Sequence, residues 1–67
     1  MMSLERLVER LVNKLMELDA GVSIASTKAN QLSAINRGLS SLGVGRLPSL
    51  SDIGAVRRAL ASVERMG

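Results

Sequence analysis

The side chains in this sequence that could do chemistry are few and scattered. The six carboxylates stand at positions 5, 9, 17, 19, 52 and 64, and the chain contains no His and no Cys. General acid–base catalysis at neutral pH uses His, or carboxylates tuned by burial. Glu5 and Glu9 lie four residues apart on what would be the polar face of a helix, where carboxylates are solvated. The sequence therefore predicts no catalytic acid or base.

The hydroxyl groups and glycines offer no other recognisable chemistry. A serine nucleophile needs an activating base close by, and the sequence places none beside any of its serines. Gly43 and Gly45 do not belong to a phosphate-binding loop, because no Gly-Lys-Ser/Thr follows them and no strand pattern precedes them. Without His and Cys, carboxylates are the only side chains left to bind a metal. We expect a protein that is not an enzyme and that has no metal site and no cofactor.

The elements that position these side chains must be built from aliphatic residues alone. The chain has 67 residues, no Phe, Tyr or Trp, and no Cys for a disulfide. A chain of this length forms one small domain, residues 1–67, which buries a modest share of its surface. Domains of this size usually need a disulfide, a metal or a partner chain for stability. We therefore expect the chain to bury apolar surface against copies of itself or against a larger protein assembly.

Residues 3–20 carry the clearest helical pattern, with Ser3 as the expected N-cap and Gly21 as the expected stop. Apolar residues spaced by four and three form a heptad seam, widened by Leu7 and Val12. Two explanations stand side by side: self-association along this seam, or packing of the same face against the rest of the chain. On the first, the partner interface comprises Leu4, Leu7, Val8, Leu11, Val12, Leu15 and Leu18.

A second helix is predicted over residues 24–42, capped by Ser23 or Ser26. Its apolar stripe comprises Leu32, Ile35, Leu39 and Leu42. Gly38 lies inside this helix, where glycine costs up to about 1 kcal/mol relative to alanine. We interpret it as a kink or a point at which two helices cross.

Two glycines and a proline in residues 43–48 predict the end of the second helix. A third helix is predicted over residues 50–65, with Ser49 and Asp52 forming a capping box at its start. Its stripe comprises Ile53, Val56, Leu60 and Val63. The fold class is therefore all-α, with three short helices forming a helical hairpin or an open three-helix bundle that oligomerisation completes.

The charge pattern supports a second functional hypothesis. The net charge is +3, and residues 20–51 contain Lys28, Arg37 and Arg46 but no acid. Residues 39–53 resemble the helix, turn and helix of a DNA-binding motif, in which Arg46, Arg57 and Arg58 would contact nucleic acid. The turn is long for that motif, and the third helix contains no Asn or Gln to read bases. DNA binding is therefore the alternative and not the main prediction.

The function predicted from the sequence is structural. We expect a homo-oligomer or an adaptor that docks onto a larger protein assembly through apolar helix faces, for instance as a small virion component. The sequence contains no run of eighteen apolar residues, so it predicts no membrane-spanning helix. Glu5 and Glu9 interrupt any signal-peptide pattern at the start of the chain. We expect an intracellular or particle-associated protein.

Overall fold

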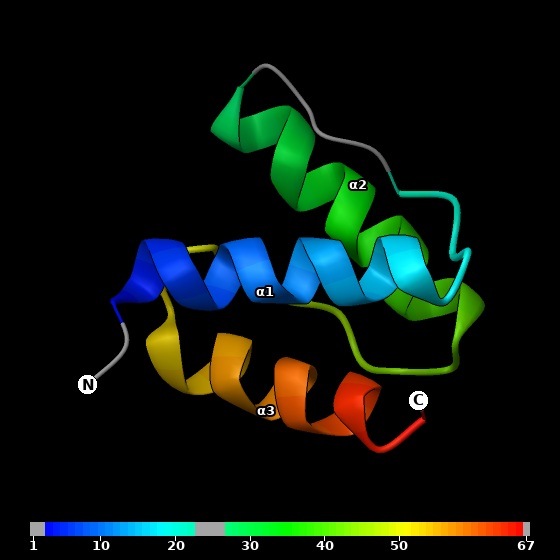
Figure 1. Ribbon diagram of the computed structural model, residues 1–67. Coiled ribbons are helices and arrows are strands. Elements are labelled where there is room, and N and C mark those ends of the chain that lie inside the picture. The colour runs from blue at the N-terminus through cyan, green and yellow to red at the C-terminus, as the bar shows by residue number, and fades with distance from the viewer. Residues whose placement is uncertain (1–2, 23–26, 67) are drawn as a thin grey trace.

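The computed structural model describes residues 3–22 and 27–66, which form three α-helices. They are α1 (Leu4–Glu17), α2 (Lys28–Ser41) and α3 (Ile53–Glu64), and the described residues contain no strand. Helix α1 lies in the middle, with α2 on one side and α3 on the other (Figure 1). Helices α1 and α3 run in the same direction, and α2 crosses α1 obliquely (Figure 1). The predicted all-α fold with three short helices is confirmed.

Helix α1 begins as its sequence predicts and ends earlier. The hydroxyl of Ser3 accepts a hydrogen bond from the backbone N–H of Arg6 at 3.3 Å, which confirms Ser3 as the N-cap. The helix ends at Glu17 because Asp19 adopts a left-handed backbone with φ of 55°. The N–H groups of Asp19 and Ala20 then bond the last free carbonyls of the helix, at 3.1 Å each. Gly21 also has positive φ, but it follows the stop instead of making it.

Helix α2 begins at Lys28, about one turn later than predicted. Thr27 is the N-cap, because its hydroxyl accepts a hydrogen bond from the N–H of Asn30 at 3.1 Å. The predicted caps Ser23 and Ser26 lie outside the described residues. At the other end Gly43 has φ of 75°, and the N–H of Val44 bonds the carbonyl of Leu39 at 2.8 Å. The glycine that the sequence marked as a breaker thus closes the helix in a left-handed conformation.

Helix α3 begins at Ile53, and the predicted start at residue 50 is wrong. Asp52 is itself the N-cap, with its Oδ1 accepting from the N–H of Ala55 at 3.1 Å. Ser49 instead accepts from the N–H of Ser51 at 3.0 Å, which makes a local turn before the helix. Both side chains accept a hydrogen bond from a backbone N–H. Ser49 does so in the turn before the helix, and Asp52 does so in the first turn of the helix.

The core is aliphatic and centred on α1. The largest fully buried side chains come from all three helices: Leu11, Leu15, Ile35, Leu39, Val56 and Val63. Ile53 was expected on the buried stripe of α3, but it is 41% exposed because it occupies the first position of the helix. The accessible surface of 4302 Å² is close to the roughly 4,100 Å² expected for a folded monomer of this mass. The single chain is therefore about as compact as an ordinary small monomer.

Gly38 marks the place where α2 crosses the end of α1. A Cβ atom added at Gly38 would overlap the Cγ2 of Val22 and would lie 3.5 Å from the Cδ1 of Leu15. The backbone of α2 therefore approaches Val22, which follows α1, more closely than any other residue type would allow, whereas its approach to Leu15 of α1 is an ordinary contact. Gly38 is thus a point of close approach between α2 and the segment that follows α1.

Candidate functional site

The structure divides the predicted seam of α1 into a buried part and a partly exposed part. Leu11 and Leu15 are 0% exposed, and Leu7 and Val12 are 6% exposed. These four side chains pack within their own chain, and one of them, Val12, also borders a surface hollow. The alternative of packing within the chain accounts for them. Leu4, Val8 and Leu18 are only partly buried, and they are what remains of the predicted interface.

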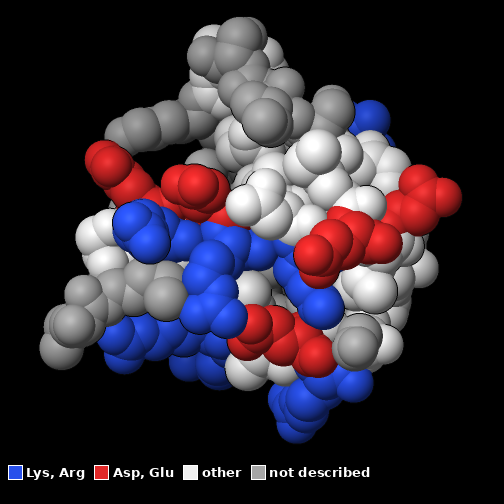
Figure 2. Space-filling view, in the orientation of Figure 1, with Lys and Arg blue, Asp and Glu red and all other residues white. Residues whose placement is uncertain are grey.

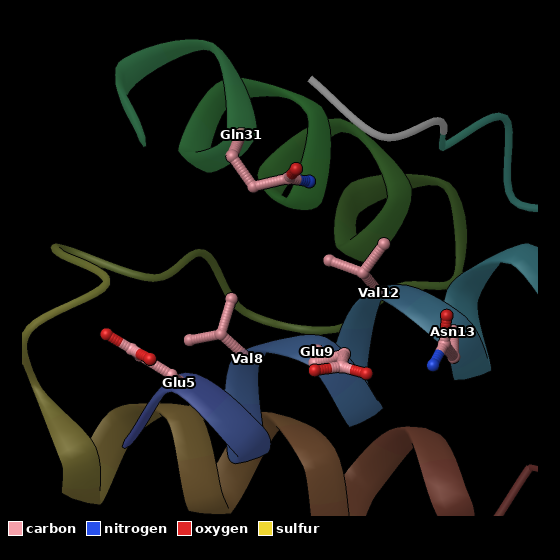
Figure 3. A pocket seen from close by; sticks show the side chains of 6 residues that line it. All are labelled: Glu5, Val8, Glu9, Val12, Asn13 and Gln31. Carbon is pink, nitrogen blue, oxygen red and sulfur yellow. The ribbon is translucent and has the colours of Figure 1, made fainter. Parts of the chain in front are cut away.

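A groove opens where the first half of α2 diverges from α1. Its volume is about 240 Å³, and it is lined by Glu5, Val8, Glu9, Val12, Asn13 and Gln31. Figure 3 shows the side chains of Val8 and Val12 pointing from α1 toward α2, while Gln31 points back from α2. The floor of the groove is therefore apolar. Sequence reasoning placed Val8 and Val12 in an interface but did not identify Gln31 or the groove.

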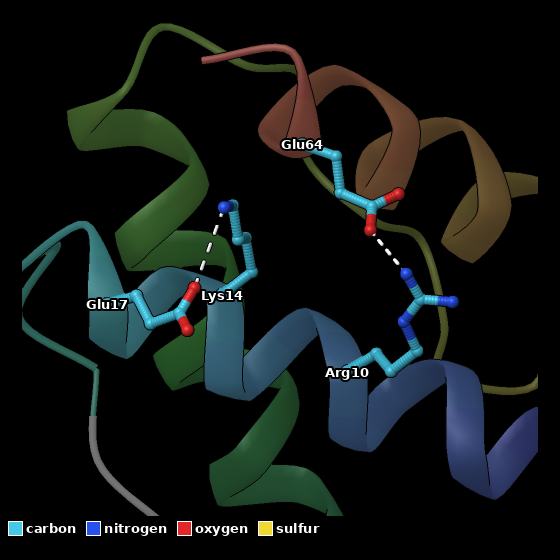
Figure 4. Close-up of polar contacts among 4 residues, drawn as sticks. All are labelled: Arg10, Lys14, Glu17 and Glu64. Atoms are coloured by element: carbon cyan, nitrogen blue, oxygen red, sulfur yellow. Dashed lines mark hydrogen bonds and ion pairs between the residues drawn. The ribbon is translucent and has the colours of Figure 1, made fainter. Parts of the chain in front are cut away.

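The rim of this groove is acidic. Glu5 and Glu9 are exposed, form no ion pair within the described residues, and share the groove with no cationic side chain. Two cations of the same helix have acidic partners elsewhere (Figure 4). Arg10 bonds Glu64 of α3 at 2.5 Å, and Lys14 lies 3.5 Å from Glu17. The groove consequently favours an apolar group accompanied by a positive charge.

A second hollow has the opposite charge. It has a volume of about 300 Å³ and is lined by Ser33, Asn36, Arg37, Ser40 and Arg46, with no carboxylate among them. Arg46 also borders a neighbouring hollow of about 250 Å³, which Arg58 of α3 lines as well. The structure thus brings together Arg46 and Arg58, two of the three predicted nucleic-acid contacts. Arg57 is exposed and lines neither hollow.

Asn36 fixes the segment that carries Arg46. Its side-chain Nδ2 donates to the carbonyl of Leu47 at 3.0 Å, and the N–H of Leu47 donates to its Oδ1 at 2.6 Å. Asn36 is 7% exposed and Leu47 is 4% exposed, so both hydrogen bonds are shielded from water. No pattern in the sequence predicted this pair. The absence of acids from residues 20–51 was the one signal that could have added Arg37 to the basic residues named above.

The arrangement of α2 and α3 is not that of a helix-turn-helix. Residues 42–52 separate the two helices, and each of them packs mainly on α1 instead of on the other. In a helix-turn-helix the two helices are joined by a short turn and pack together. The predicted resemblance to that motif is therefore wrong in its geometry, although the arginines it named remain on the surface.

The fold and these surfaces define a three-helix all-α domain whose first helix is central. The sequence matches no known protein family and no curated protein, and its fold matches no solved structure. Among the described residues, no helix combines the length and apolarity needed to cross a bilayer. Those residues also contain no group of three or more acidic side chains placed to hold a metal ion.

Proposed function

We propose that this protein is a non-catalytic docking module that associates with a second copy of itself through the groove between α1 and α2. The observation that carries the proposal is the open groove itself, with an apolar floor of Val8 and Val12 and an acidic rim of Glu5 and Glu9. Surfaces with an apolar centre and a polar rim are typical of protein interfaces.

The first turn of α3 in a second copy has the chemistry to occupy this groove. Ile53 is a large aliphatic side chain that is 41% exposed, and Arg57 is exposed one turn further along the same helix. Residues four apart lie on one helix face, so Ile53 and Arg57 face outward together. Ile53 would enter between Val8 and Gln31, and Arg57 would pair with Glu9 or Glu5. The occupant and the groove are thus complementary in both polarity and charge.

The two partners in this contact lie at the same end of the molecule. The N-terminal half of α1 and the first turn of α3 are both on the left of Figure 1. A two-fold axis at that end would let each copy receive the α3 of the other, which gives a closed dimer. The groove is small, so we expect a weak association that depends on concentration. A larger assembly, such as a virus particle, would strengthen the same contact by repeating it.

A charge exchange tests this contact without touching the core. Glu9→Arg and Arg57→Glu each place like charges at the interface, and each should shift dimerisation to at least tenfold higher concentration. The double variant restores opposite charges and should recover most of the loss. The measurement is molecular mass by sedimentation across micromolar to millimolar protein, with helicity checked by circular dichroism.

Glu17→Arg provides the matched control, because Glu17 is an exposed acid of α1 outside the groove. It should dimerise as the unmodified chain does. A protein that remains monomeric at millimolar concentration contradicts self-docking. If the double variant dimerises no better than the single variants, the Glu9–Arg57 pairing is wrong even if a dimer forms.

A further inference from the structure

We infer that Arg37, Arg46 and Arg58 form a surface that binds the phosphate groups of a nucleic-acid backbone without regard to base sequence. This surface is separate from the groove between α1 and α2, since the two share no lining residue. The inference therefore does not depend on self-association.

Arg46 makes the two basic hollows continuous. It lines the hollow that contains Arg37 and also the one that contains Arg58. The first hollow has no acidic side chain, and Ser33 and Ser40 add hydroxyl donors beside Arg37. The second hollow has one acid, Asp52, and its Oδ1 already accepts the hydrogen bond that caps α3. The three arginines therefore lie along one surface whose single acid, Asp52, stands at the end near Arg58.

The pattern differs from that on the face formed by α1 and α3. There, red and blue side chains are interspersed over α1 (Figure 2), and Arg10 and Lys14 have acidic partners. Arg37, Arg46 and Arg58, by contrast, make no ion pair with any of the described residues. Guanidinium groups that share a surface repel one another, and an anion placed between them would remove that repulsion. Phosphate is one of the two anions, with carboxylate, whose geometry guanidinium groups match through paired N–H donors.

The fold holds the middle arginine in place before any ligand arrives. Arg46 directly precedes Leu47, whose N–H and carbonyl are both bonded to the side chain of Asn36. Asn36 in turn is buried one residue before Arg37. A single amide side chain thus fixes the backbone on which Arg46 stands relative to that of Arg37. A surface arranged in advance loses less entropy when it binds.

The extent of the surface favours a polymer over a single anion. Three cationic side chains border two adjoining hollows, so they can meet successive phosphates along a backbone. The chain has no aromatic residue on which bases would stack, and α3 contains no Asn or Gln. Contacts limited to phosphate give affinity without sequence preference. With about three phosphate contacts, the slope of log K against log salt concentration should be about −2.7 on duplex DNA.

Two double variants of equal net charge test the inference. Arg37→Gln with Arg46→Gln removes two members of the surface, whereas Arg6→Gln with Arg65→Gln removes two exposed arginines outside it. Each variant lowers the net charge from +3 to +1. Binding is measured by fluorescence anisotropy of labelled duplexes of two unrelated sequences, from low salt upward, with folding checked by circular dichroism.

We expect the unmodified chain to bind both duplexes equally. The Arg37/Arg46 variant should lose at least tenfold in affinity and about two units of salt slope, since it loses about two phosphate contacts. The Arg6/Arg65 variant should lose less than threefold. Equal losses in the two variants would mean that net charge alone causes binding, and would overturn the inference. The inference would also be overturned if the unmodified chain bound no DNA at low salt. It would be overturned as well if inorganic phosphate displaced the bound DNA at an equal concentration of phosphate groups.

Discussion

Helix α1 contacts its two neighbours in different ways. It packs extensively against α3, which runs beside it in the same direction and is joined to it by the bond between Arg10 and Glu64. Its contact with α2 is more limited. Helix α2 is close to it near Gly38, in the second half of α2, and lies farther away in the first half. The extensive contact produces a closed core, whereas the limited contact leaves the groove lined by Val8, Val12 and Gln31. The long contact with α3 therefore accounts for the closed core, and the short contact with α2 leaves the groove proposed for docking.

The buried side chains of the two helices extend over different lengths. On α3 they run along most of the helix, because Val56, Leu60 and Val63 are each 5% exposed or less. On α2, Ile35 and Leu39 are 0% exposed, whereas Gln31 and Leu32, nearer the start of the helix, are only partly buried. The comparison teaches that a helix contact extends only as far as its fully buried side chains do.

Truncating a core side chain of α3 should have the largest effect. Leu60→Ala removes three carbon atoms from a side chain that is 5% exposed and should lower the free energy of unfolding by about 3 kcal/mol. Urea denaturation followed by circular dichroism measures the change. Met66→Ala, at a position that is 48% exposed just after the same helix, is the control and should change stability by less than about 0.5 kcal/mol. Similar effects of the two variants would show that α3 is not tightly packed on the core.

Removing the hydrogen bonds of Asn36 should come next. Asn36→Ala leaves the N–H and carbonyl of buried Leu47 without their partner and should cost about 2 kcal/mol. Helix α1 packs less extensively against α2 than against α3. The variant therefore tests whether residues 42–52 help to keep α2 in place. Asn30→Ala, exposed on the same helix, is the control for loss of an amide. Amide hydrogen exchange should show faster exchange at Leu47 only in the Asn36 variant. Unchanged exchange there would contradict this role.

Filling the crossing point should have a smaller effect and an unusual sign. Helix propensity alone predicts that Gly38→Ala stabilises α2 by about 1 kcal/mol. The overlap with Val22 should outweigh this gain and leave a net loss of about 1 kcal/mol in the free energy of unfolding. Thermal and urea unfolding both report the sign. In a Val22→Ala background the loss caused by Gly38→Ala should be smaller, because Val22→Ala removes the Cγ2 methyl that the new Cβ would overlap. A net stabilisation by Gly38→Ala alone would show that the crossing is looser than described.

Local signals in the sequence predicted the elements well. The heptad spacing, Ser3 and the break at Gly43 predicted helices whose ends differ from the observed ones by a few residues. The starts of α2 and α3 were placed too early because several Ser, Thr and Asp residues compete as caps. Which one caps depends on where the backbone turns, as Thr27 and Asp52 show. Local patterns therefore find a helix more reliably than its first residue.

The candidate surfaces were much harder to predict, since they depend on how helices meet. The apolar face of α1 is the same in sequence whether it packs within the chain or against a partner. Only the way α2 and α3 pack on α1 decides that Leu11 is buried while Val8 remains partly exposed. The pairing of Asn36 with Leu47 joins residues eleven apart across a turn, and no periodicity marks it. Arg57 and Arg58 are adjacent in sequence, yet only Arg58 lines a basic hollow.

The parallel course of α1 and α3 has a consequence for the time order of folding. Arg10 and Glu64, which join these helices, are 54 positions apart along the chain. A nascent segment that has not reached Ile53 lacks the helix that covers one side of α1, so it cannot form the main part of the core. The entropy of closing so long a loop is lost before the contacts between α1 and α3 stabilise the chain. This slows folding relative to helical hairpins of similar size. We therefore expect the folding rate of this small protein to depend on how often α1 and α3 meet.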